Sequence, residues 1–190
     1  MKLYIIRHGK TTQGENDIIL GSLPGTLSEK GIQEAHKIGK YLSSEKYDIS
    51  KIITSGLDRT IQTGKIISEY IKVPTSQNFI INERDSGIAE GKKESEINWD
   101  LYEKKSLPYR KHLNGESFID VKKRARNFLN YINTNQGNIG ILIISHSVFI
   151  LMLISLIKKI SIKKALQIDI KNKIIYFDVN TKELKLLDIN

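Results

Sequence analysis

The chain alternates between short apolar runs and longer segments with helical spacing. Apolar, β-branched runs occupy residues 3–6, 51–53, 79–81 and 139–144, and turn or polar residues bound each of them. Runs of this length and composition predict buried strands.

Three helical patterns lie between and after these runs. Ser28 precedes the first of them, and serine is a favoured N-terminal cap. The expected inner faces are Ile32, Ala35, Gly39 and Leu42; Leu57, Ile61, Gly64 and Ile71; and Phe118, Val121, Ala125, Phe128 and Ile132. Alternation of strands and helices predicts an α/β fold with a mainly parallel sheet covered on both faces. Residues 173–189 predict a closing hairpin that turns at Asn180–Thr181.

The apolar stretch 139–157 is long enough to resemble a transmembrane helix. Ser145, His146 and Ser147 interrupt its middle, the part before them is β-branched, and the part after them is rich in leucine. We therefore interpret it as a buried strand followed by a buried helix.

Length and composition narrow the remaining choices. With 190 residues, we expect one domain over residues 1–190, with an insertion of about 83–137 that forms part of the site cover. The net charge of +9 is spread over scattered lysines, so we expect no nucleic-acid and no membrane partner. The absence of cysteine excludes disulfides and thiolate metal sites. The N-terminus lacks a secretion-signal pattern, and a cytoplasmic location is expected.

Charged side chains follow the ends of the predicted strands. Arg7 and His8 follow the first run, Arg59 follows the second, Glu83 and Arg84 follow the third, and His146 follows the fourth. Open α/β sheets bind ligands beyond the carboxyl ends of their strands, so these groups are expected to converge.

The chemistry of this set favours phosphate over metal. Arginine has no lone pair for a metal, whereas its forked donors match phosphoryl oxygens. Each residue also has an ordinary alternative: Arg59 as a surface cation, His146 as a core histidine, and Glu83 with Arg84 as a loop ion pair. Their common position at strand ends favours the phosphate site.

Six motifs, in order and nearly end to end, carry a family resemblance: "RHGKT", "LSEKGIQEA", "SGLDRTIQT", "INERDSGIAEG", "NGESFIDVKKR" and "IISHS". With them the chain resembles the histidine phosphatase superfamily, which has the phosphoglycerate-mutase-like fold. Within it, the chain is most similar to α-ribazole phosphatases and broad-specificity phosphatases. The resemblance implies a three-layer α/β/α sandwich and phosphoryl transfer through a histidine nucleophile, without a metal or cofactor.

The resemblance also implies roles for individual residues. His8 would attack phosphorus, and Glu83 would protonate the leaving oxygen and then activate water. The implied catalytic residues are His8, Glu83 and His146. The implied phosphate-binding residues are Arg7, Arg59, His146 and Ser147.

Some positions depart from the family pattern. Gly14 stands where the family commonly has a phosphate-contacting asparagine, and Ser86 and Ala89 replace aromatic residues. Lys10 either favours substrates with extra negative charge or is merely solvated. The candidates for substrate binding are Lys10, Asn16 and Arg84.

The first functional hypothesis is a phosphomonoesterase that hydrolyses a small phosphorylated metabolite through a phosphohistidine. The alternative is a 2,3-bisphosphoglycerate-dependent phosphoglycerate mutase, for which residues 83–115 look too short to form the lid. The second alternative is a catalytically weak protein that binds phosphate esters. The sequence is compatible with a homodimer.

Overall fold

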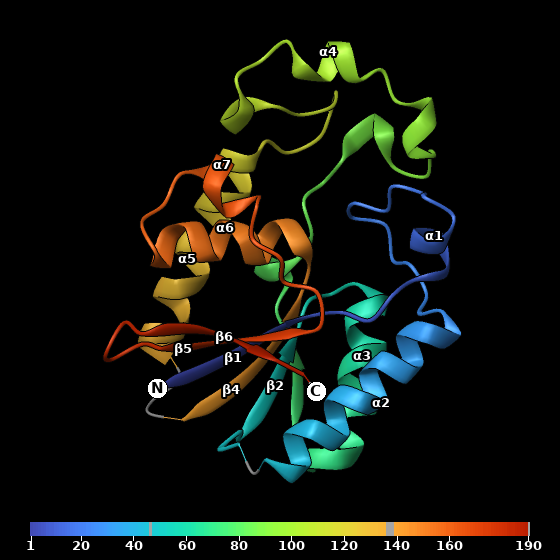
Figure 1. The fold of residues 1–190 in the computed structure, drawn as a ribbon. Coiled ribbons are helices and arrows are strands. Elements are labelled where there is room, and N and C mark those ends of the chain that lie inside the picture. Colours follow the sequence, from blue (N-terminus) through green and yellow to red (C-terminus); the bar gives the residue numbers. More distant parts are fainter. Residues whose placement is uncertain (46, 136–138, 190) are drawn as a thin grey trace.

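The computed structural model of the protein describes residues 1–45, 47–135 and 139–189 (Figure 1). Its strands and helices are, in order, β1 (Lys2–Arg7), α1 (Thr12–Glu15), α2 (Glu29–Ser44), β2 (Lys51–Thr54), α3 (Asp58–Ile71), β3 (Thr75–Gln77), α4 (Trp99–Glu103), α5 (Phe118–Asn135), β4 (Gly140–Ser145), α6 (Ser147–Ile157), α7 (Ile162–Ala165), β5 (Lys173–Asp178) and β6 (Leu184–Asp188). Four 3-10 turns, at Phe79–Ile81, Gly87–Ala89, Glu94–Glu96 and Leu107–Tyr109, complete the set.

The strands form one six-stranded sheet in the order β3-β2-β4-β1-β5-β6. The first four strands are parallel, and β5 and β6 add an antiparallel hairpin at one side, as predicted. Arg7 pairs with Ser145, and Thr54 pairs with Ile144 in the neighbouring strand. The carboxyl ends of β1, β4 and β2 therefore reach the same edge of the sheet.

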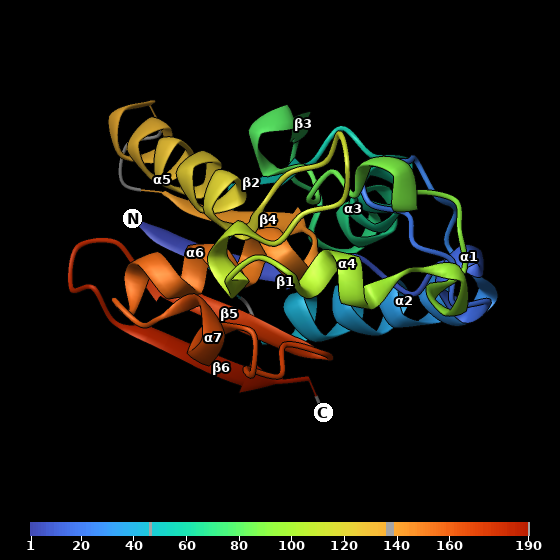
Figure 2. The same cartoon turned by 90° about the horizontal axis from the view of Figure 1, so that it is seen from above.

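Helices cover both faces of the sheet, which confirms the predicted three-layer sandwich. Alternate residues of β1 point to opposite faces. Leu3 and Ile5 pack in a core with α5 and α6, whereas Tyr4 and Ile6 pack in a second core with α2 and α3. Figures 1 and 2 show these two helix pairs on opposite sides of the sheet.

The apolar stretch 139–157 forms strand β4 and helix α6, as predicted, with His146 at the N-cap between them. Both elements are almost wholly buried. Among the described residues, no helix is long and apolar enough to cross a membrane.

The strand predicted at residues 79–81 is wrong. Phe79–Ile81 is a 3-10 turn, in which the Asn78 side chain accepts a hydrogen bond from the amide of Ile80 and Phe79 is 68% exposed. The third parallel strand is instead Thr75–Gln77, a fully exposed edge strand that pairs with β2. A polar edge strand does not show the apolar run on which the prediction rested.

Two helices are rotated relative to the predicted faces. In α2, Ser28 caps the helix as predicted, but Ile32 is 40% exposed and Ile38 takes its place in the core. In α3, Ile61 and Ile71 are only partly buried, and the buried face is largely polar. The predicted inner face of α5 is buried throughout.

Residues 82–117 leave the sheet and lie beyond the carboxyl ends of the parallel strands, with α4 farthest from the sheet (Figure 1). This segment contains three of the 3-10 turns and helix α4. It contacts the loop after α1, where Ile18 forms an isolated bridge with Lys93.

Candidate active site

Three residues from distant parts of the sequence meet at the carboxyl edge of the sheet. His8 directly follows β1, Arg59 lies in the first turn of α3, and His146 directly follows β4. The two imidazole rings are 5.0 Å apart between centroids. Arg59 Nε lies 3.3 Å from His8 Nε2 and 3.2 Å from His146 Nδ1, so its single proton is shared between the two rings.

His8 is held in one tautomer. Its Nδ1 lies 2.7 Å from the carbonyl oxygen of Gly9, and because a carbonyl only accepts, Nδ1 carries the proton. The lone pair is then on Nε2, which faces Arg59. Burial, reinforced by the charges of Arg7 and Arg59, lowers the pKa of His8 well below its ordinary value. The ring is therefore neutral near pH 7, as a nitrogen nucleophile must be.

Close backbone packing fixes the loop that carries His8. The amide of Gly9 donates to Thr63 Oγ1 on α3. A side chain at Gly9 would collide with the carbonyl of Gly31, and one at Gly31 would collide with that of Lys10. The two glycines thus let this loop cross the first turn of α2 in direct backbone contact.

His146 is fully buried and its ring is oriented by hydroxyl groups. Its Nδ1 accepts from Arg59, so its Nε2 carries the proton and donates to Ser55 Oγ at 2.8 Å. Ser55 Oγ in turn lies 2.7 Å from Thr60 Oγ1. The pKa of His146 lies well below its ordinary value, mainly because the ring is buried, and the nearby His8 and Arg59 lower it further. Ser55 and Thr60 lie inside the motif "SGLDRTIQT", but the sequence indicates no role for them.

Arg59 is also buried, and backbone carbonyls occupy the rest of its guanidinium. Nη1 donates to the carbonyls of Leu23 and Pro24, and Nη2 donates to that of Gly21 at 2.7 Å. Burial lowers the pKa of Arg59 to about 10, so the group remains charged at neutral pH.

Glu90 anchors the loop that holds Arg59. Its carboxylate accepts from the amide of Ser22 at 2.6 Å, from the Ser22 hydroxyl at 2.9 Å and from the amide of Ser86 at 2.9 Å. The loop 21–24 is thereby tied to the segment 82–117, and Arg59 is held by groups that are not adjacent to it in sequence.

Glu83 lies at the N-terminus of α6, close to the residues that the sequence predicts as a site. Its two carboxylate oxygens accept from the amides of Arg84 at 2.8 Å and Val148 at 3.3 Å. Ser147, the first residue of α6, is half-buried beside them. The amide end of α6 therefore lies at the edge of the predicted site, beside the Glu83 carboxyl group.

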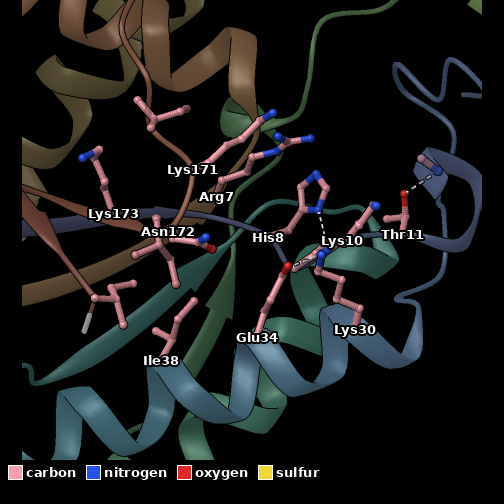
Figure 3. Close-up of a pocket in the computed structure, with 15 residues that line it drawn as sticks. Arg7, His8, Lys10, Thr11, Lys30, Glu34, Ile38, Lys171, Asn172 and Lys173 are labelled. Atoms are coloured by element: carbon pink, nitrogen blue, oxygen red, sulfur yellow. Dashed lines mark hydrogen bonds between the residues drawn. The ribbon is translucent and has the colours of Figure 1, made fainter.

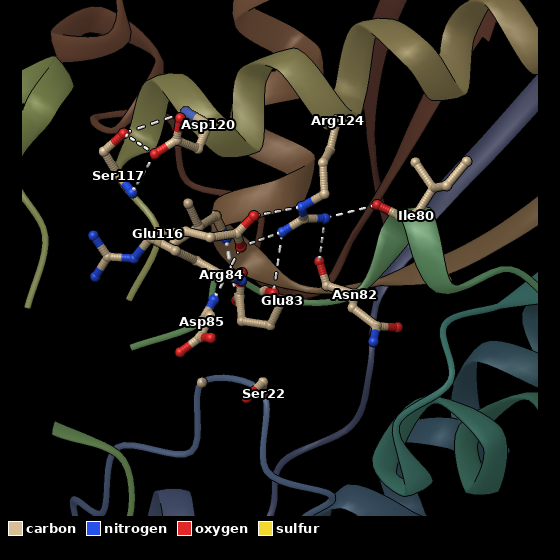
Figure 4. Close-up of polar contacts among 12 residues, drawn as sticks. Ser22, Ile80, Asn82, Glu83, Arg84, Asp85, Glu116, Ser117, Asp120 and Arg124 are labelled. Carbon is tan, nitrogen blue, oxygen red and sulfur yellow. Dashed lines mark hydrogen bonds and ion pairs between the residues drawn. The ribbon is translucent and has the colours of Figure 1, made fainter. Parts of the chain in front are cut away.

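Arg124 on α5 fixes the backbone that carries Glu83 (Figure 4). It forms a forked ion pair with Glu116, at 2.7 and 2.6 Å, and donates to the carbonyls of Ile80, Asn82 and Glu83. Arg124 is the last residue of the motif "NGESFIDVKKR", but the sequence indicates no individual role for it. Its carbonyl partners lie within residues 80–83, an irregular part of the chain that no periodicity reveals.

The three predicted substrate-binding residues lie in different places. Lys10 borders the cavity beside His8 and is 3.8 Å from Glu15. Asn16 donates to the carbonyl of Thr12 and borders a separate surface pocket with Asp17. Arg84 donates to the Tyr102 hydroxyl and stacks 4.5 Å above the Phe118 ring, inside the segment 82–117. Of the three, only Lys10 shares a cavity with His8.

A cavity of about 470 Å³ opens beside His8 (Figure 3). Arg7, His8, Gly9 and Thr11 form one side of it, and α2 and the loop before β5 form the others. In the part of the chain that the structure describes, no three His, Cys, Asp or Glu residues are grouped as metal ligands would be. Neutral imidazoles beside buried and half-buried arginines define an anion site.

Sequence comparison places this site in a known family. The family profile of the histidine phosphatase superfamily (branch 1) matches residues 3–189, and the chain belongs to this family. Phosphoglycerate mutase 1 of Saccharomyces cerevisiae is 34% identical over 113 residues, which are 58% of this chain and 46% of that protein. A broad-specificity phosphatase from the same yeast is 34% identical over 94 residues, 48% of this chain and 41% of that protein. These matches span less than half the length of either relative.

Solved structures agree with the fold. Bacillus stearothermophilus YhfR superposes with a TM-score of 0.87 at 25% identity, covering 97% of this chain and 94% of that one. A putative alpha-ribazole-5'-P phosphatase from Escherichia coli superposes with a TM-score of 0.86 at 22% identity, covering 99% and 96%. Both comparisons extend over nearly the whole chain.

Proposed function

We propose that the protein is a phosphomonoesterase that hydrolyses a small phosphorylated metabolite through a phosphohistidine, without a metal ion. The observation that supports this most strongly is the fixed tautomer of His8, whose Nε2 lone pair lies beside a buried arginine. Of the insertion expected at about 83–137, the segment 82–117 serves in this proposal as part of the cover over the site, because α5 packs against the sheet instead.

In the first step, His8 Nε2 forms a bond to phosphorus while the bond from phosphorus to the ester oxygen breaks. Glu83 gives its proton to the leaving oxygen. Arg7, Arg59 and the amide end of α6 at Ser147 stabilise the negative charge on the phosphoryl oxygens.

In the second step, Glu83, now a carboxylate, takes a proton from water, whose oxygen attacks phosphorus. The bond from phosphorus to His8 Nε2 breaks, and His8 returns to the neutral ring with its proton on Nδ1. Inorganic phosphate leaves and Glu83 is protonated again, so charge and atoms balance over the cycle.

His146 needs a proton to contribute a hydrogen bond to phosphate. Its Nε2 proton already goes to Ser55, and its Nδ1 is an acceptor in the free protein. A bound phosphate dianion favours protonation of Nδ1, after which His146 donates to Ser55 and to phosphate together. In this proposal, His146 takes up a proton when phosphate binds.

The test is hydrolysis of p-nitrophenyl phosphate by the intact protein. We expect His8→Ala to lower turnover about a thousandfold or more, and a chelator to leave the wild-type rate unchanged. His36→Ala is the matched control, because His36 lies on α2 and bonds the Tyr70 hydroxyl instead of the site. Turnover that survives in His8→Ala, or that the chelator removes, contradicts the proposal.

The similarity to a yeast phosphoglycerate mutase makes mutase activity the second candidate. It is measured with 3-phosphoglycerate and catalytic 2,3-bisphosphoglycerate, by following 2-phosphoglycerate and free phosphate together. Formation of 2-phosphoglycerate well above phosphate release would favour the mutase over the phosphatase.

A further inference from the structure

We propose that the cavity beside His8 is a ligand site separate from the catalytic centre, and that it binds a small organic anion with an apolar body, such as a medium-chain carboxylate. The proposed phosphomonoesterase function neither requires nor excludes such a site. Three features of the cavity support it: its position relative to the catalytic groups, its apolar floor and its excess of positive charge.

The cavity borders the loop that carries His8 but not the rest of the proposed catalytic centre. Its walls are residues 7–11, the facing part of α2, and the start of β5 with the segment before it (Figure 3). The other groups assigned to the phosphate ester are absent from the lining, namely Arg59, Glu83, His146 and Ser147. His8 Nε2 lies 3.3 Å from Arg59, so a phosphoryl group bonded to this nitrogen lies toward those residues. A ligand in the cavity therefore does not occupy the position of the phosphoryl group.

The floor of the cavity is apolar. It consists of four isoleucines that are each at most 8% exposed: Ile6, Ile38, Ile170 and Ile189. The cavity volume of about 470 Å³ is in the range of small-molecule sites. A hydrated inorganic ion would leave the isoleucines in contact with water, whereas an apolar body would cover them. The floor therefore favours an organic ligand over an inorganic ion.

The lining carries more positive than negative charge. It contains five cationic side chains and one carboxylate, that of Glu34, which accepts from the backbone amide of Lys10 at 2.9 Å. Two of the cations have carboxylate partners, Lys10 with Glu15 at 3.8 Å and Lys173 with Asp188 at 2.6 Å. An anion in the cavity would offset the remaining positive charge.

Lys30 and Lys171 are the exposed cations of the lining that lack such partners. Within the part of the chain that the structure describes, neither has a carboxylate within ion-pair distance. Lys30 lies on α2 and Lys171 lies before β5, so they come from two different walls of the cavity. We assign recognition of the anionic group to these two lysines.

Hydrogen bonds between distant segments fix the walls of the cavity. The bond from the Lys10 amide to Glu34 joins the His8 loop to α2. The amide of Ile189 donates to the carbonyl of Asn172 at 3.2 Å, which joins the two ends of the β5–β6 hairpin. The amide of Lys171 donates to Asp169 Oδ1 at 3.0 Å. A preformed cavity of this kind loses little conformational freedom when a ligand binds.

The test uses the intact protein and anilinonaphthalene sulfonate, an aromatic anion whose fluorescence rises in an apolar site. We expect saturable binding that octanoate displaces. Octanol lacks the charge and inorganic sulfate lacks the apolar body, so each should displace the probe about tenfold less well than octanoate. Inorganic phosphate should leave the Kd of the probe as it is in sodium chloride of the same ionic strength, because the catalytic centre lies outside the cavity.

A pair of double variants locates the site. Lys30→Gln combined with Lys171→Gln should raise the Kd of the probe about tenfold, or about threefold for each exposed charge. Lys163→Gln combined with Lys164→Gln is the matched control, because it removes two equally exposed lysines from α7, outside the cavity, and should leave the Kd unchanged.

Three results would overturn the inference: no saturable binding of the probe, the same Kd in both double variants, or displacement of the probe by phosphate. Hydrolysis of p-nitrophenyl phosphate tests the proposed function separately. Either proposal can therefore fail while the other stands.

Discussion

Arg124→Lys should impair catalysis selectively, because Arg124 holds the backbone of the proposed general acid without touching the phosphate site. Its guanidinium donates two hydrogen bonds to the Glu116 carboxylate. It donates three more to the backbone carbonyls of Ile80, Asn82 and Glu83. The substitution keeps the positive charge and removes the planar fork. If Arg124 acts by positioning Glu83, the substitution should lower the rate of hydrolysis most for esters whose leaving oxygen has to be protonated.

The structure sets the size of the stability effect. A lysine amine has three donors, so at least two of the five hydrogen bonds of Arg124 are lost. Arg124 is only half-buried, so each unmade hydrogen bond should cost about 1–2 kcal/mol, the lower part of the usual range of about 1–3 kcal/mol, and the free energy of unfolding should fall by about 2–4 kcal/mol. That is less than the ~5–15 kcal/mol typical of a domain, so the variant remains folded at room temperature.

The assay compares an alkyl phosphate, a poor leaving group, with p-nitrophenyl phosphate, a good one. Misplacing Glu83 removes proton donation, an effect of about 10²–10⁴ when complete. We expect kcat/KM, which reports the first step, to fall about tenfold or more for the alkyl ester and about threefold or less for the aryl ester. The kcat values are not compared, because hydrolysis of the shared phosphohistidine also uses Glu83. Arg126→Lys, on the exposed side of the same helix, is the control and should change neither rate.

An equal loss for the two esters would refute this reasoning, because it would separate Arg124 from proton donation. So would a variant with full stability and full activity, since the five hydrogen bonds would then have no consequence. Denaturant unfolding of both lysine variants distinguishes these cases from global unfolding.

Three further predictions follow from the same contacts. The pKa values of His8 and His146 lie well below about 6.5, the ordinary value in an unfolded chain, so the unfolded state binds more protons below about pH 6.5. The free energy of unfolding should therefore be level above that pH and fall below it. Equal free energies of unfolding at about pH 5 and about pH 7.5 would contradict the burial argument. Glu90→Gln should weaken the hydrogen bonds that hold the loop at Ser22 and so disturb Arg59. We expect the KM for phosphate esters to rise about threefold to tenfold, with a smaller effect on kcat. An unchanged KM would show that the loop does not need the carboxylate. When inorganic phosphate binds near neutral pH, we expect His146 to take up a proton. Titration calorimetry in two buffers of different ionisation enthalpy detects this uptake as a difference between the two binding heats. Identical heats in the two buffers would exclude proton uptake.

The central part of the site could be predicted because its signals are local. Arg7 is the last residue of β1, His8 and His146 directly follow β1 and β4, and Arg59 lies in the first turn of the helix after β2. Parallel strands end at one edge, so adjacency in sequence to a strand end translates into adjacency in space. In the structure, Arg59 lies within hydrogen-bond distance of both His8 and His146.

The supporting contacts could not be predicted because they join distant segments. Thr63 on α3 accepts from Gly9, 54 residues earlier, and Ser55 bonds His146, 91 residues later. Apolar periodicity assigned the inner face of α3 to Leu57, Ile61, Gly64 and Ile71, whereas Ile61 and Ile71 are only partly buried and the hydrogen-bonded Thr60 and Thr63 are fully buried. Glu90 likewise acts on a loop 68 residues away. Periodicity along the sequence indicates which apolar groups are buried. It does not indicate polar groups whose hydrogen-bond partners come close only in the folded chain.

The environment of Arg59 leaves a buried cation available to the phosphoryl group of the proposed mechanism. Three backbone carbonyls satisfy the outer nitrogens of the guanidinium, and two neutral histidines share its remaining proton. Carbonyl dipoles fill the hydrogen-bonding capacity of a cation but do not cancel its charge, whereas a direct carboxylate partner would do both. Glu83 and Glu90 act on Arg59 only from a distance, and each is held by backbone amides of its own. The side chain is therefore fixed in place while its positive charge stays uncompensated, and a phosphoryl group can supply the missing negative charge.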